Sequence, residues 1–182
     1  MKKKAKIFAG LAAVCLIVIS IFAGTAIAKN RSMHQFVKYL EENGYSCSKD
    51  ICSMQSKIEE GSIEETYTET YNFNDNTFAV KFVHDDRSKE IITEMEYVYN
   101  YKDDTVTVNQ YDTKDAGTER KPDAVYSLNR EEMVECIYGD GSADEIVLHD
   151  NMLRFKQAFE KHLEESGVTL QDIIREVIDR NA

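Results

Sequence analysis

Proline and tryptophan are almost missing from this sequence. Its 182 residues include one proline, Pro122, and no tryptophan. The scarcity of proline excludes proline-rich and collagen-like chains, and the rest of the composition suits one globular domain. The sequence also contains no internal repeat, low-complexity tract or interdomain linker.

Basic residues are scarce relative to acidic ones. The chain has 22 Lys and Arg residues against 33 Asp and Glu residues, for a formal charge of −11. Residues 29–182 alone hold 18 bases and 33 acids, a net charge of −15, because the other bases are lysines near the N-terminus. Such a surface repels nucleic-acid phosphates and anionic lipid headgroups. We therefore expect no nucleic-acid partner and no membrane attachment through a basic patch.

Signatures of common enzymes are absent as well. The sequence has no G-x-S-x-G, H-E-x-x-H, Walker A, dinucleotide-binding or C-x-x-C motif. Ser46 and Lys49 match S-x-x-K, a pattern of serine acyltransferases, but the K-T-G and S-D-N motifs that accompany it are missing. These absences remove the local evidence for an enzyme without excluding one.

Acidic residues and histidines do not form a recognisable metal motif. Residues 140–151 begin like a calcium-binding EF-hand loop, but Glu145 stands where the turn needs glycine and Asn151 where a bidentate glutamate belongs. Zinc usually takes nitrogen or sulfur ligands at close spacings, whereas the histidines here are scattered. They are His34, His84, His149 and His162. We expect neither a metal nor another cofactor.

The N-terminal segment has the pattern of an export signal. Lysines between residues 2 and 6 precede an uncharged run of 22 residues, 7–28, that ends with the small residues Ala26 and Ala28. Small residues at these two positions suit cleavage after Ala28, which would remove residues 1–28. A run of this length can also stay uncleaved as a membrane anchor, with the domain at 29–182 outside the cell. Both alternatives predict one extracytoplasmic domain.

Export changes the interpretation of the cysteines. Three remain beyond residue 28, Cys47, Cys52 and Cys136, and outside the cytoplasm thiols persist as disulfides. A hairpin can bring Cys47 and Cys52 within bonding distance. We favour this pair over the other two pairings, each of which would also leave one free thiol.

Hydrophobic periodicity indicates an α+β fold. Met33, Phe36, Val37 and Leu40 follow helical spacing, and Gly44 can end that helix. After residue 44 the pattern changes to segments rich in Thr, Tyr, Val and Ile that are separated by polar turns. These segments are 63–73, 78–84, 90–101, 105–111 and 124–128. Short connections favour an antiparallel meander of about five strands.

Helical patterns return after residue 128. Asn129 with Glu132 predicts one helix start, Ser142 with Glu145 a second, and Thr169 with Asp172 a third. Glycines at 139 and 167 are placed to end the first two of these helices. The second helix has an apolar stripe of Leu148, Met152, Phe155, Phe159 and Leu163. We expect three C-terminal helices on one face of the sheet.

Tyrosines gather on one face of the predicted strands. Tyr67 and Tyr71 share one register, as do Tyr97, Tyr99 and Tyr101 on another strand. Exposed, they would form an aromatic platform for sugars or cations; packed under the helices, they would be a structural ladder in the core. The sequence leaves both interpretations open.

These features favour an exported, bacterial-type, non-catalytic domain that binds an extracytoplasmic protein or small ligand. One alternative is an exported hydrolase that uses Cys136 as nucleophile with His149 or His162 as base. A second alternative is a purely structural envelope protein. Residues 7–28 would attach the chain to the membrane if they are not cleaved.

Overall fold

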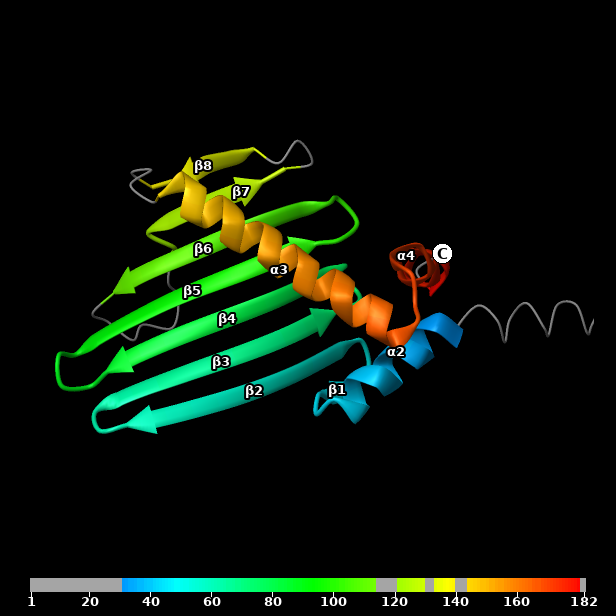
Figure 1. The fold of residues 1–182 in the computed structure, drawn as a ribbon, viewed down its shortest axis with the longest axis horizontal. Coiled ribbons are helices and arrows are strands. Elements are labelled where there is room, and N and C mark those ends of the chain that lie inside the picture. The colour runs from blue at the N-terminus through cyan, green and yellow to red at the C-terminus, as the bar shows by residue number, and fades with distance from the viewer. Residues whose placement is uncertain (1–30, 114–120, 130–132, 140–143, 181–182) are drawn as a thin grey trace, which may run out of the picture.

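The computed structural model describes residues 31–113, 121–129, 133–139 and 144–180 of the chain. The fold is α+β, with helices lying against one face of an antiparallel sheet (Figure 1). The predicted signal or anchor segment, 1–28, with Ala26 and Ala28, lies outside the described residues. Within those residues, none of the helices is both long and apolar enough to span a membrane.

The sheet is a single meander in which each strand pairs only with its neighbours in sequence. In the described ranges it has eight strands in the order β1 to β8, all antiparallel. Their bounds are β1 Ser46–Ser48, β2 Ile51–Glu60, β3 Ile63–Asn72, β4 Thr77–Asp86, β5 Ile91–Asn100, β6 Thr105–Thr113, β7 Ala124–Leu128 and β8 Val134–Tyr138. Asn76 and Asp104 adopt positive φ angles of 58° and 57° in the turns before β4 and β6. Asn and Asp tolerate this backbone better than other side chains, which explains why short turns form there.

Three helices are described: α2 (Arg31–Glu42), α3 (Glu145–Ser166) and α4 (Leu170–Arg180). The long helix α3 runs diagonally across one face of the sheet (Figure 1). Its predicted apolar stripe is confirmed as buried. Asp144 caps its start by accepting hydrogen bonds from the backbone of Ile146 and Val147, and Gly167 ends it with φ 69°. The core lies between this stripe and the sheet.

Helices α2 and α4 meet at one end of the sheet through an unusual cap. The carboxylate of Glu176 on α4 accepts hydrogen bonds from the backbone N–H of Ser32 (3.1 Å) and Met33 (2.8 Å) on α2. Glu176 is 2% exposed, and a buried carboxylate needs partners. These two backbone donors and the positive end of the α2 dipole are its partners. Thr169 and Asp172 form the predicted capping pair of α4, with the Thr169 hydroxyl 3.2 Å from the Asp172 N–H.

The predicted meander is confirmed, but the number of strands and the arrangement of the helices are corrected. The segment at 134–138, expected to be helical, is strand β8, and it pairs with β7. The strand is only five residues long, and its pairing satisfies backbone groups that β7 would otherwise leave unpaired. Glu132 and Ser142 lie outside the described residues. Only α3 and α4 remain of the three helices expected in this part of the described chain.

The sequence reasoning also missed β1 and β2. Most of β2 is polar and exposed, so it lacks the alternation that marks a half-buried strand. It forms because all ten of its residues pair with β3. Cross-strand pairing, rather than its own hydrophobic pattern, determines this element.

Candidate ligand-binding groove

Helix α3 covers only part of the sheet face on which it lies. Tyr71 and Tyr99 under the helices are 0% and 1% exposed. On β3, Tyr67 lies four residues from the buried Tyr71 and is 37% exposed. On the neighbouring strand β4, Phe82 lies four residues from the buried Phe78 and is 39% exposed. Because strand residues of the same parity share a face, the apolar surface continues beyond the edge of α3.

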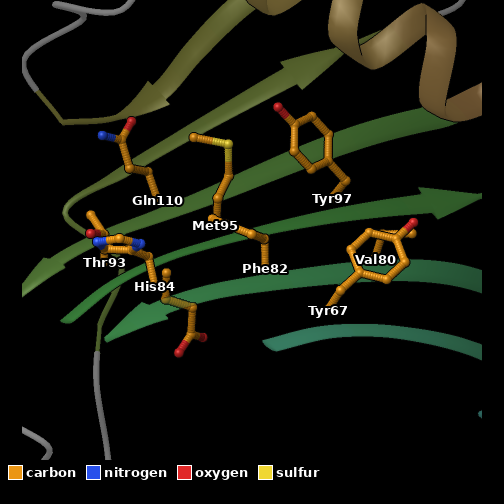
Figure 2. Close-up of a pocket in the computed structure, with 9 residues that line it drawn as sticks. Tyr67, Val80, Phe82, His84, Thr93, Met95, Tyr97 and Gln110 are labelled. Carbon is orange, nitrogen blue, oxygen red and sulfur yellow. The ribbon is translucent and has the colours of Figure 1, made fainter. Parts of the chain in front are cut away.

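This uncovered surface contains a cavity of about 540 Å³. Tyr67 of β3, Val80 and Phe82 of β4, and Met95 and Tyr97 of β5 form its apolar floor (Figure 2). The sheet register explains the grouping, since Tyr67 pairs with Phe82 and Phe82 with Met95. Polar residues complete the lining: His84, Thr93, Glu94 and Gln110.

A second cavity of about 430 Å³ adjoins the first along α3. The two share Tyr67, Val80 and Tyr97, so they form one elongated depression, called here the groove. The wall of the second cavity is a stripe on α3 with helical spacing. The stripe consists of Asn151, Arg154, Phe155, Ala158 and His162. The small side chain of Ala158 leaves this part of the wall open.

The tyrosine hydroxyls in the groove are neutral and hydrogen-bonded. The Tyr67 hydroxyl donates to Glu69 Oε1 at 2.8 Å, and the Tyr45 hydroxyl donates to the other oxygen of the same carboxylate. Burial, followed by this hydrogen bond to Glu69, raises the pKa of Tyr67 well above its ordinary value. Burial also raises the pKa of Tyr97, although a hydrogen bond with Asn151 opposes the shift. Both rings therefore present an apolar face with an uncharged polar tip.

Most charged groups around the groove are paired. His84 Nδ1 lies 3.2 Å from Glu65 Oε1. The side chain of Glu94 has the parity of the opposite sheet face, where it lies 2.5 Å from Lys81 Nζ. Arg154 differs, because it forms no ion pair or hydrogen bond with any of the residues described. The groove thus combines an apolar floor with a wall that carries one unpaired cation.

The predicted tyrosines differ in burial. Tyr71, Tyr99 and Tyr101 are at most 2% exposed, so they belong to the core and do not form an open binding face. Tyr99 and Tyr101 pack on Phe159 of α3 with ring centroids 5.3 and 5.2 Å apart. Tyr67 and Tyr97 of the predicted set do line the groove.

Other groove residues were not anticipated. Phe82 and Met95 belong to alternating segments, and that alternation could have placed them beside Tyr67. Arg154 and His162 share a face of α3 by spacing alone, but the sequence does not show which part of the sheet that face approaches. The position of α3 across the sheet supplies this information.

The predicted Cys47–Cys52 disulfide is confirmed. The two residues pair across β1 and β2 with their Cα atoms 4.0 Å apart. Cys52 also pairs with the buried Tyr71, which places the bond next to the core rather than in the groove. We assign it a structural role.

Cys136 is exposed on β8, and its sulfur lies 3.4 Å from the carbonyl oxygen of Tyr138. His149 Nδ1 lies 3.7 Å from Asp150 Oδ1, and His162 Nδ1 is hydrogen-bonded to the Tyr71 hydroxyl. Across the described ranges no histidine is hydrogen-bonded to Cys136, so the geometry that the hydrolase alternative requires is not found there. In that same part of the chain no group of three or more His, Cys, Asp or Glu residues is arranged to hold a metal ion.

Comparison with known proteins gives no match to a family model, a curated protein or a solved structure. Functional inference for this chain therefore depends on the geometry of the groove.

Proposed function

We propose that the chain is a non-catalytic, extracytoplasmic protein that binds an elongated apolar small molecule in the groove. The observation that carries this proposal is the apolar floor left open beside α3. Exposing aromatic and aliphatic side chains there costs free energy, about 25 cal/mol for each Å² of apolar surface. A ligand that covers Tyr67, Phe82 and Met95 would recover that free energy.

The dimensions of the groove support a small molecule. Its two cavities, about 540 and 430 Å³, each fall within the usual range for ligand sites, about 300–1,000 Å³. The lining follows the usual composition of such sites, mostly apolar and aromatic with a few polar groups. The groove extends from the open sheet floor of the first cavity to the helix wall of the second. A chain-like molecule therefore fits it better than a compact one.

The location outside the cytoplasm is supported by two independent features. The sequence of residues 1–28 has the charge and hydropathy pattern of an export signal. The Cys47–Cys52 disulfide is stable in oxidising compartments and rare in the cytoplasm. Whether residues 7–28 are cleaved or retained as an anchor does not alter the groove.

The proposal is tested with Nile red, an uncharged dye whose emission rises in apolar surroundings. We expect the purified protein to bind the dye, and Phe82→Glu to weaken binding about tenfold or more, because it removes apolar contact and adds a charge. The matched control is Ile146→Glu. Ile146 is 77% exposed on α3 and does not line the groove.

Two results would contradict the proposal. One is a protein that leaves Nile red emission unchanged. The other is binding that Phe82→Glu and Ile146→Glu weaken equally, which would place the dye outside the groove. Circular dichroism spectra of both variants establish that they are folded.

A further inference from the structure

We infer that the ligand carries an anionic head group that binds Arg154, and that its class is a long-chain carboxylate. This inference rests on the proposed function, because it assigns the polar end of the ligand whose apolar part occupies the groove. The juxtaposition that carries it is the exposed guanidinium of Arg154, which has no partner among the described residues, beside an elongated apolar floor.

Arg154 is the basic residue of α3 that faces the groove. The other basic residues of this helix have acidic partners: Lys156 lies 2.5 Å from Asp104, and Lys161 lies 3.6 Å from Glu165. Arg154 has no such partner among the residues described, yet it lines the second cavity. A guanidinium binds a carboxylate through two parallel hydrogen bonds, which makes an anion the complementary ligand group.

Two further polar side chains lie on the same wall. Asn151 precedes Arg154 by three residues, and its side chain is hydrogen-bonded to Tyr97. His162 Nδ1 is hydrogen-bonded to the Tyr71 hydroxyl, and the His162 ring lines the second cavity. The wall beside Arg154 therefore carries further polar side chains.

Glu69 is the acidic side chain in the same cavity, and it is the reason to consider a cationic ligand instead. Both of its oxygens already accept hydrogen bonds, from Tyr45 and Tyr67. Its charge is thus partly compensated, whereas Arg154 has no acidic partner in the described part of the chain. The balance of charge in the second cavity therefore favours an anionic head group.

The acidic surface of the domain does not prevent an anionic head group from binding at Arg154. Residues 29–182 carry a net charge of −15, but salt at physiological strength screens charges beyond about 8 Å. Contact with Arg154 is shorter than that distance and is screened less. The carboxylate would lie at Arg154, with the alkyl chain running over Tyr97 towards Met95 and Phe82.

The test compares three amphiphiles with the same alkyl chain: dodecanoate, dodecanol and dodecyltrimethylammonium. The two charged amphiphiles are used below their micelle concentrations, and dodecanol below its solubility limit, to displace Nile red from the wild-type protein, Arg154→Gln and Lys161→Gln. We expect wild-type protein to bind dodecanoate about tenfold more tightly than dodecanol, as one charged hydrogen-bonded contact provides. Arg154→Gln should lose that preference and keep its affinity for dodecanol. Lys161→Gln, a change to a paired lysine on the same helix, should behave as the wild type.

Failure of this inference can be distinguished from failure of the proposed function. Equal affinity for dodecanoate and dodecanol, or tighter binding of dodecyltrimethylammonium, would overturn the anionic head group while leaving an apolar site. A preference for dodecanoate that survives in Arg154→Gln would overturn the role of Arg154. Absence of Nile red binding in the wild type would overturn the proposed function itself, and this inference with it.

Discussion

At the scale of single residues, Asp86 shows how a turn holds its own carboxylate ionised. The sequence places it between two strands, where aspartate is common. In the structure it is 4% exposed, and its carboxylate accepts hydrogen bonds from Ser88 Oγ at 2.6 Å and Lys89 Nζ at 2.8 Å. The bond to Lys89, followed by the bond to Ser88, lowers the pKa of Asp86 from 3.8 to about 2.

This shift predicts a loss of stability in acid. Since the folded protein holds Asp86 ionised below its ordinary pKa, the unfolded chain takes up the proton first as the pH falls. The stabilisation by Asp86 is therefore complete above about pH 4 and is lost towards pH 2. We expect Asp86→Asn to be less stable than the wild type at pH 6, with the difference shrinking between about pH 4 and 2.

Urea denaturation at a series of pH values measures this effect. Asp150→Asn is the control, because Asp150 is an exposed carboxylate on α3. A difference between Asp86→Asn and the wild type that stays constant down to pH 2 would contradict the assigned pKa shift.

At the scale of elements, β8 shows where local pattern and tertiary pairing disagree. Gly139 was expected to end a helix, and in the structure it directly follows β8. It has φ 108°, and a Cβ at this position would lie 2.8 Å from both Ala124 Cβ and the carbonyl oxygen of Asp123. Glycine is required there because β7 packs against the chain, rather than because a helix ends.

A substitution distinguishes these two reasons. We expect Gly139→Ala to lower the free energy of unfolding by about 1–3 kcal/mol more than Gly61→Ala. Gly61 also has a positive φ, 62°, but a Cβ there would meet nothing within 4 Å. Gly61 lies within the left-handed region that other residues can adopt, whereas Gly139 at φ 108° lies outside it, so the difference reports the backbone of Gly139 together with its close approach to β7. Equal losses in urea denaturation would show that the close approach is unimportant.

At the scale of the whole molecule, the oblique course of α3 produces both the core and the groove. One part of the sheet face is sealed by the apolar stripe of the helix, and the adjoining part is open. A buried ladder and an open aromatic surface therefore coexist on one face: Tyr71, Tyr99 and Tyr101 belong to the core, and Tyr67 and Tyr97 line the groove.

The proposed export and the disulfide are checked by intact mass spectrometry of the protein recovered from its host. We expect a species that begins at Lys29, after cleavage behind Ala28. Before reduction, iodoacetamide should modify only Cys136, which is exposed, and after reduction it should also modify Cys47 and Cys52. Full-length protein in the membrane fraction would instead identify residues 7–28 as an anchor. Modification of Cys47 or Cys52 before reduction would contradict the disulfide.

Local pattern determined the elements whose apolar residues recur at a regular spacing. The stripe of α3 and its end at Gly167, the capping pair at Thr169, and the strands from β3 to β7 could all be predicted. The disulfide could be predicted because its residues are near in sequence and a hairpin brings them together. Each of these features depends on interactions between residues that are close along the chain.

Only the tertiary structure decided which surfaces face each other. Tyr67 and Tyr71 have the same parity on β3, so the sequence cannot tell the groove from the core. Arg154 faces the groove because α3 crosses the sheet obliquely, and Glu176 caps α2 although 143 residues separate it from Met33. Periodicity assigns a side chain to a face of its own element. The packing of that element against others determines whether the face is buried, open or opposite a charge.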